Sequence, residues 1–142
     1  MSTQEDTMAA RILVIEDSPA SLDLLTFLLK KTGHTAFEAR DGEKGLEIAR
    51  REKPDLVICD LQVPRMDGYE IARQIRGDPQ ICNMPLVAVT AFAMQGDCDK
   101  VMEAGFDGYI TKPISPREFV DQLEPFLRSS SSVGHPAALL SI

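Results

Sequence analysis

Short apolar runs alternate with longer amphipathic stretches along most of the chain. The apolar runs are typical of strands, and the stretches whose apolar positions recur every three or four residues are typical of helices. We expect strands at residues 11–15, 35–39, 56–59, 86–89 and 106–110. We expect helices at residues 19–31, from 42 to just before Pro54, and at 68–77, 96–104 and 116–128.

Most of the expected strands are apolar throughout and do not alternate with polar positions, which indicates a parallel sheet buried on both faces. Right-handed crossovers would then place helices on both sides of the sheet. The predicted fold is α/β: a doubly wound, five-stranded parallel sheet flanked by five helices, of the flavodoxin-like class. We expect a flexible N-terminal arm at residues 1–10, one domain at residues 11–128 and a serine-rich C-terminal tail at residues 129–142.

The charge balance narrows the possible partners. With 15 basic and 22 acidic residues the net charge is -7, which argues against direct binding to nucleic acid or to an anionic membrane. No apolar run approaches the roughly 20 residues of a membrane span, and the first ten residues do not resemble a signal peptide. We therefore expect a cytoplasmic protein, and 142 residues leave no room for a second output domain.

The chain has three cysteines, Cys59, Cys82 and Cys98, without CxxC spacing. An odd number at this spacing suggests neither a disulfide framework nor a zinc site. We interpret them as reduced thiols and expect Cys59 to be buried in its strand.

Polar residues follow four of the five expected strands: Glu16 and Asp17, then Asp60, Thr90 and Lys112. The carboxyl ends of parallel strands share one edge of the sheet, where ligands bind in open α/β folds. Clustered carboxylates repel one another unless a cation neutralises them, and an all-oxygen cluster suits Mg²⁺. Thr90 and Lys112 suit phosphoryl oxygens, so Asp60 becomes a candidate nucleophile for phosphoryl transfer.

With these motifs in order, the chain resembles the receiver domains of response regulators, the CheY-like superfamily, over residues 11–127. The motifs are Glu16-Asp17, Asp60 with Pro64-Arg65-Met66-Asp67-Gly68, Val89-Thr90-Ala91, and Lys112-Pro113. Segments around Thr90 and Lys112 are also similar to receivers of hybrid kinases and to DivK-type single-domain regulators. Because no output domain fits in the chain, we expect a stand-alone regulator, and a receiver that is part of a hybrid kinase remains the alternative.

The resemblance implies that Asp60 accepts a phosphoryl group from a phosphohistidine on a partner sensor kinase or histidine phosphotransferase. It implies Mg²⁺ bound by Asp17, Asp60 and the backbone carbonyl of Gln62, with Glu16 acting through water. A regulator of this kind is not an enzyme, apart from catalysing its own phosphoryl transfer and autodephosphorylation.

The resemblance also implies a conformational switch. Thr90 and Lys112 would hold the phosphoryl group, and Thr90 would move toward it on activation while Tyr109 turns inward. The Lys112-Pro113 peptide is typically cis in these domains. A downstream protein would then bind the face made by the fourth helix, the fifth strand and the fifth helix.

Two other functions remain open from the sequence. A Mg²⁺-dependent phosphohydrolase could use Asp60 as a nucleophile, but such enzymes want a second Asp at the position of Gln62. A pseudo-receiver that is never phosphorylated would serve only as an interaction module. Asp67 is interpreted as a loop or helix-cap residue, and both histidines, His34 and His135, as bystanders.

Overall fold

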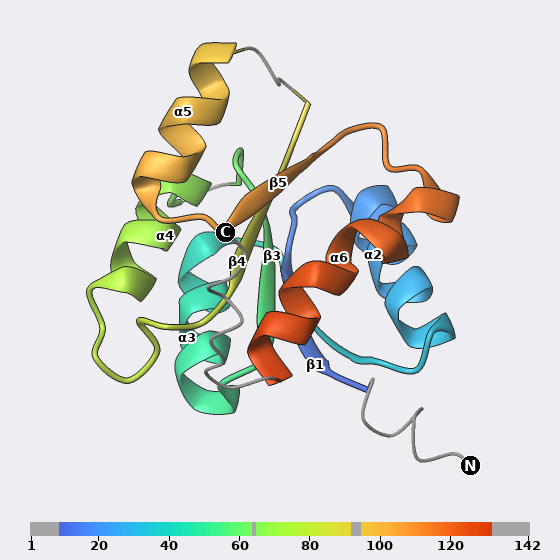
Figure 1. The fold of residues 1–142 in the computed structure, drawn as a ribbon. Helices are drawn as coiled ribbons and strands as arrows, with labels where there is room; N and C mark the ends of the chain where they lie inside the picture. Colours follow the sequence, from blue (N-terminus) through green and yellow to red (C-terminus); the bar gives the residue numbers. More distant parts are fainter. Residues whose placement is uncertain (1–8, 64, 92–94, 132–142) are drawn as a thin grey trace.

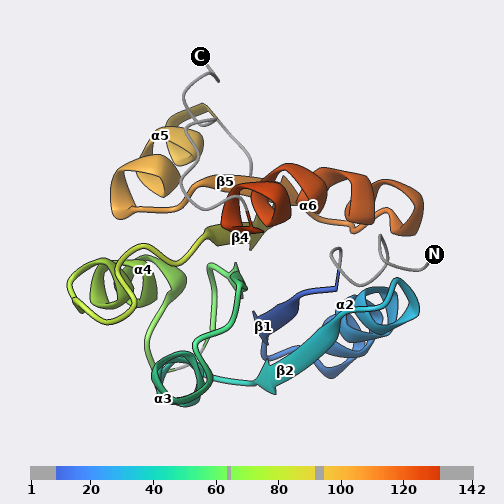
Figure 2. The same ribbon diagram turned by 60° about the horizontal axis from the view of Figure 1, so that its bottom comes forward.

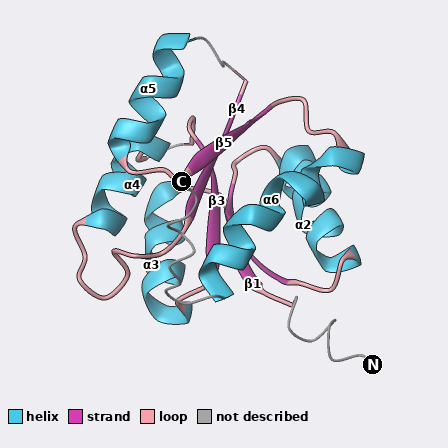
Figure 3. Cartoon of the chain, viewed as in Figure 1, coloured by secondary structure: helices cyan, strands magenta, loops and turns pink. Residues whose placement is uncertain are grey.

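A computed structural model of the chain describes residues 9–63, 65–91 and 95–131, with only the backbone described at residues 95–98 and 128–131. Strands and helices alternate along the described residues (Figures 1 and 3). The strands are β1 (Arg11–Ile15), β2 (Thr35–Ala39), β3 (Leu56–Asp60), β4 (Leu86–Thr90) and β5 (Gly108–Thr111). The helices are α2 (Pro19–Lys31), α3 (Gly42–Glu52), α4 (Gly68–Arg76), α5 (Gln95–Ala104) and α6 (Pro116–Ser131).

All strand pairs are parallel, and the five strands form one sheet in the order β2-β1-β3-β4-β5. Helices α3, α4 and α5 cover one face of the sheet, and α2 and α6 cover the other (Figure 2). The strand order reverses between β1 and the central strand β3, and ligand sites form at such a switch point in doubly wound sheets. The predicted fold class is confirmed.

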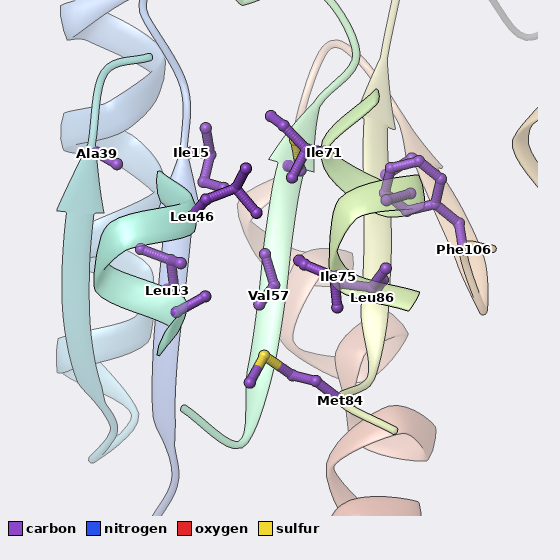
Figure 4. Close-up of a cluster of buried hydrophobic side chains, with 14 of the residues drawn as sticks. Leu13, Ile15, Ala39, Leu46, Val57, Ile71, Ile75, Met84, Leu86 and Phe106 are labelled. Atoms are coloured by element: carbon purple, nitrogen blue, oxygen red, sulfur yellow. The ribbon is translucent and has the colours of Figure 1, made fainter. Parts of the chain in front are cut away.

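Alternate residues of each central strand face opposite layers. Leu13 and Ile15 of β1 belong to the core under α3, α4 and α5, whereas Ile12 and Val14 belong to the core under α2 and α6. Figure 4 shows the first of these cores, with Leu46 of α3 directed toward the β1 side chains. Both faces of the sheet are therefore buried in hydrophobic cores, as the continuous apolar runs predicted.

Capping side chains start three of the helices. Ser18 precedes α2, with Pro19 in the first turn, and its hydroxyl accepts a hydrogen bond from the Ser21 amide at 3.4 Å. Asp41 caps α3, and Asp67 caps α4 by accepting from the Glu70 amide at 2.9 Å. The interpretation of Asp67 as a helix-cap residue is confirmed.

The predicted bounds of β5 are wrong at the N-terminal end. Phe106 is buried outside the strand, and β5 begins at Gly108. The Asp107 side chain explains the delay, because its Oδ2 accepts the Leu86 amide at 2.8 Å while its own amide donates to the Leu86 carbonyl at 2.7 Å. This exchange of hydrogen bonds between Asp107 and Leu86 replaces the regular strand pairing at this position.

Other ends differ by a few residues. The strands β3 and β4 include Asp60 and Thr90, so both residues are the last of their strands. Helix α6 continues through Ser131, past the expected boundary at residue 128, and contains Pro125. Residues 1–8 and 132–142, with His135, lie outside the described residues, so the arm and most of the tail stay predictions.

Two further observations concern the described residues only. None of their helices combines the length and apolarity needed to cross a membrane. Cys59 is buried, as expected, and burial is the main cause that raises the pKa of its thiol well above the ordinary value. Cys82 is a free thiol of intermediate exposure, and the side chain of Cys98 lies outside the description.

Candidate functional site

The carboxyl ends of four strands are held in register at one edge of the sheet. Cα pairing places Ile15 opposite Cys59, Asp60 opposite Val89 and Thr90 opposite Thr111. Backbone hydrogen bonds continue one residue past the strand ends. The Glu16 amide donates to the Ala39 carbonyl at 2.9 Å, and the Lys112 amide donates to the Thr90 carbonyl at 2.8 Å. The candidate side chains therefore start from a rigid edge.

Three of the predicted side chains meet there. Lys112 Nζ lies 3.0 Å from Asp60 Oδ2 and 3.2 Å from Glu16 Oε1. Asp60 Oδ1 accepts the Gln62 amide at 3.0 Å, and Glu16 Oε2 accepts the Ser18 amide at 3.1 Å. Both carboxylates are buried, with exposed fractions of 8 % for Asp60 and 1 % for Glu16. One lysine thus serves two buried carboxylates.

This arrangement shifts the pKa values of two groups. Burial, followed by the negative charge of Asp60, raises the pKa of Glu16 above its ordinary value. Burial alone would lower the pKa of Lys112, but its hydrogen bond to Asp60 and the charges of Asp60 and Glu16 outweigh that effect and raise it. Lys112 is therefore fully charged at neutral pH, and the carboxylates repel each other across it.

One oxygen of Glu16 is not fully satisfied. Oε1 is buried and faces Lys112, yet it receives no hydrogen bond of good geometry from any described residue. Two carboxylates and one ammonium also leave one negative charge unbalanced when both acids are ionised. The site therefore has the negative charge and the oxygen ligands that a bound cation requires.

The structure does not bring all the predicted metal ligands together. Asp17 is exposed, and the described residues contain no group of three or more His, Cys, Asp or Glu side chains arranged to hold a metal ion. Mg²⁺ is usually held by one or two carboxylates plus waters and phosphate oxygens, so Glu16 and Asp60 fit such an ion without a third acid. Gln62 contributes its amide to Asp60.

The remaining predicted residues border this edge. Thr90 is buried at the end of β4, whereas Tyr109 on β5 is 40 % exposed. The Lys112-Pro113 peptide is cis, as the resemblance implied. Tyr109 therefore faces outward in this structure, while the threonine with which its movement is expected to be coupled lies inside.

Two contacts that hold the loop after Asp60 were not predicted from the sequence. Gly68 begins α4 so close to the loop that a Cβ atom would lie 2.8 Å from Leu61 Cα. Gly42 begins α3, where a Cβ atom would lie 2.7 Å from the Met66 carbonyl oxygen. Asp-Gly at both helix starts was the available signal, but it indicates a cap and a turn, and not which segment packs against the glycine.

Comparison with known proteins agrees with this geometry. The family model described as "Response regulator receiver domain" matches residues 12–124. The polar-differentiation response regulator DivK of Brucella anthropi is 32 % identical over 120 residues, which cover 84 % of this chain and 98 % of DivK.

Two solved structures are similar over most of their length. The signal receiver domain of a histidine kinase from Syntrophus aciditrophicus is 30 % identical, with a TM-score of 0.78, covering 89 % of this chain and 93 % of that one. The receiver domain of sensor histidine kinase PA1611 from Pseudomonas aeruginosa, which has a magnesium ion coordinated in its active site cleft, is 30 % identical with a TM-score of 0.79. Those similarities cover 85 % of this chain and 99 % of the PA1611 domain. The chain belongs to the family of response regulator receiver domains.

Proposed function

We propose that this receiver takes a phosphoryl group on Asp60 from a phosphohistidine of a partner sensor kinase or histidine phosphotransferase, with Mg²⁺ as cofactor. The observation that carries the proposal is the buried Asp60 carboxylate, which binds Lys112 at 3.0 Å at the carboxyl edge of the sheet. An oxygen of Asp60 forms the new P–O bond while the P–N bond to the imidazole breaks and its electron pair stays on the leaving nitrogen.

The residues at the edge divide the work. The Gln62 amide at 3.0 Å and Lys112 orient the Asp60 carboxylate before the reaction. Lys112 then neutralises charge on the phosphoryl oxygens, and the buried hydroxyl of Thr90 donates to one of them. Because these groups are anchored on neighbouring strands, little reorganisation is needed when phosphate arrives.

The unsatisfied Glu16 oxygen and the unbalanced charge support a bound Mg²⁺. We propose that Asp17, Asp60 and the Gln62 carbonyl hold the ion, with Glu16 acting through water; this assignment requires the exposed Asp17 side chain to turn toward Asp60, because the three acids are not clustered in the structure. When bound, the ion supplies positive charge to the phosphoryl oxygens. The magnesium reported in the PA1611 receiver supports this assignment by similarity.

Signalling output would come from protein binding. We propose that Thr90 moves toward the phosphoryl group and that Tyr109 turns inward. The face formed by α5, β5 and α6 then changes its affinity for a downstream protein. Three large hydrophobic side chains of the described residues are exposed, and two of them, Met102 on α5 and Tyr109 on β5, belong to this face, whereas Phe27 lies on α2.

The activity would be limited to the protein's own phosphoryl transfer and autodephosphorylation. The net charge of -7 supports protein partners over nucleic acid. We propose that the protein acts in the cytoplasm.

Acetyl phosphate and Mg²⁺ provide a direct test of the acceptor. Intact-mass measurement should show one added phosphate, which Asp60→Asn abolishes. Asp67→Asn is the matched control and should keep the adduct, because Asn also caps helices and can accept the Glu70 amide as Asp67 does. An adduct that persists in Asp60→Asn overturns the acceptor assignment, and no adduct in the wild type favours a pseudo-receiver.

Amide hydrogen exchange tests the output face. Beryllofluoride with Mg²⁺ should change the exchange of residues 91–112 more than that of residues 47–52, the end of α3 farther from the acceptor loop. Identical exchange in both states would contradict the proposed face while leaving the acceptor assignment intact.

A further inference from the structure

The loop between Asp60 and α4 is packed against the start of another helix. Residues 65 and 66 of this acceptor loop, which we define as residues 61–63 and 65–67, contact the first turn of α3. The contacting residues are the N-cap Asp41 and the first two helical residues, Gly42 and Glu43. This helix precedes β3 in the chain and contributes no residue to the phosphoryl site described above.

The contact is made through the backbone at Gly42. A Cβ atom at this position would lie 2.7 Å from the Met66 carbonyl oxygen and 2.8 Å from Met66 Cβ. Real Cβ atoms do not approach backbone this closely, so any side chain at residue 42 must displace the loop or the helix. Gly42 therefore fixes how near the acceptor loop lies to α3.

Arg65 shapes the same part of the loop through its backbone. Its φ of 72° is left-handed, a conformation that is costly for a residue with a Cβ atom. Its guanidinium lies 3.8 Å from Asp41 and 3.7 Å from Glu43, beyond hydrogen-bond distance, and the side chain is 63 % exposed. Exposed ion pairs of this kind contribute little, so the backbone conformation matters more than the charge.

The position of the loop is transmitted to Asp60 by short contacts. The Gly68 amide donates to the Leu61 carbonyl at 2.9 Å, which closes the loop at its base. Gln62, inside the loop, donates its amide to Asp60 Oδ1 at 3.0 Å. A displacement at Met66 therefore reaches the acceptor carboxylate through Gly68 and the peptide unit between Leu61 and Gln62, by these two hydrogen bonds.

We propose that the first turn of α3 positions the acceptor loop, and that Gly42 and Arg65 are positioning residues for phosphoryl transfer. Gly42 acts by permitting the approach of Met66, and Arg65 acts by its left-handed backbone. This inference rests on the proposed function of Asp60. It adds a control element on α3 that touches neither phosphate nor metal.

Gly42→Ala tests the contact. We expect the initial rate of acetyl phosphate labelling to fall roughly tenfold to 100-fold, since small misplacements of reacting groups have effects of this size. Gly33→Ala is the control: a Cβ atom at Gly33 meets nothing within 4 Å, so this variant introduces no steric contact, although its positive φ of 94°, which Gly42 does not share, makes alanine strained there. It should lose stability without a comparable loss of rate at a temperature where both variants are folded.

An NMR measurement without phosphate separates the two proposals. The Gln62 amide resonance of unphosphorylated protein should shift in Gly42→Ala and stay in place in Gly33→Ala. An unmoved resonance together with a wild-type labelling rate overturns the positioning role. Absence of labelling in the wild type instead refutes the proposed acceptor, whatever the Gln62 resonance shows.

Substitutions of Arg65 separate conformation from charge. Arg65→Asn removes the charge but tolerates the left-handed conformation, whereas Arg65→Val removes the charge and disfavours that conformation. We expect Asn to keep the labelling rate within about twofold and Val to lose about tenfold. Equal losses in both variants would assign the effect to the guanidinium, and a wild-type rate in Arg65→Val would overturn the backbone role.

Discussion

Lys112 reaches Asp60 across the carboxyl edge of the sheet: its Nζ lies 3.0 Å from Asp60 Oδ2, although 52 positions separate the two residues. The same ammonium lies 3.2 Å from Glu16 Oε1. A single cation thereby lies between two buried carboxylates, one directly after β1 and one at the end of β3. The stability of this edge and its affinity for a metal ion both depend on the balance between the two carboxylate charges and the one ammonium charge.

Removal of the Lys112 ammonium should leave the repulsion between the Asp60 and Glu16 carboxylates without compensation. We expect Lys112→Ala to lower the free energy of unfolding at neutral pH by about 1–3 kcal/mol, because buried Asp60 loses its charged donor and both buried carboxylates lose the ammonium that offsets their repulsion. Part of the loss should return as the pH falls and Glu16 takes up a proton. Urea denaturation measures both effects, with exposed Lys100→Ala as a control expected to stay within about 0.5 kcal/mol of the wild type.

Glu16 should make stability depend on pH with a definite sign. Burial and the charge of Asp60 raise its folded pKa above the unfolded value of 4.5. Its contribution to stability is therefore fully present below pH 4.5 and is lost as the pH rises through the folded pKa. Without Mg²⁺, Glu16→Gln should be about 1–2 kcal/mol more stable than the wild type at pH 7.

That advantage should shrink toward zero below pH 4.5, where the wild-type carboxyl is protonated in both states. Urea denaturation at several pH values without Mg²⁺ measures the difference. Added Mg²⁺ should stabilise the wild type more than the Gln variant. A Gln variant that is less stable at pH 7 would show that the ion pair with Lys112 outweighs the cost of burial.

His34 has a structural role that its sequence position did not indicate. Its Nδ1 accepts the Ala10 amide at 3.0 Å, just before β1, and burial lowers its pKa below the ordinary value of 6.5. The stability contributed by the neutral ring is present above pH 6.5 and is lost as the pH falls through the folded pKa. NMR titration should give a midpoint below 6.5, with His34→Gln assigning the signal; a midpoint at or above 6.5 contradicts the contact.

Arg76 at the end of α4 joins three segments at the opposite edge of the sheet. Its guanidinium donates to the carbonyl oxygens of Gly105, Cys82 and Met84 at 2.7–2.9 Å and to Asp107 at 3.1 Å. We expect Arg76→Ala to cost about 2–4 kcal/mol in urea denaturation, because several part-buried acceptors lose their donor.

Arg73 provides the matched control for that measurement. It lies on the same helix, is 59 % exposed at its side chain and pairs only with nearby Glu70 and no other described carboxylate within 4.0 Å. Arg73→Ala should change stability by no more than about 0.5 kcal/mol. Similar losses in both variants would point to helix propensity and not to the carbonyl contacts of Arg76.

Local patterns predicted most of the fold. The order of strands and helices followed from apolar runs and helical spacing, and caps such as Asp67 followed from residue type. The start of β5 was missed because the Asp107 side chain takes over the pairing with Leu86. That exchange depends on a contact between segments far apart in sequence, which periodicity does not report.

For the candidate site, the sequence predicted which residues lie close together but not which of their atoms are in contact. Parallel strands bring Glu16, Asp60, Thr90 and Lys112 to one edge, and the structure places them there. It does not bring exposed Asp17 into a three-acid cluster. The exact sharing of Lys112 between two carboxylates required side-chain positions.

The sequence by itself determined the parallel sheet, the residues at its carboxyl edge and the family, because these depend on local apolar pattern and on motifs at strand ends. Only the tertiary structure decided which atoms meet. Lys112 bridges Asp60 and Glu16, and Gly42 admits Met66, because packing brings together residues that are distant in the chain. Such contacts depend on strand register and on how closely backbone segments approach each other, and the spacing of residues along the chain does not determine either of these.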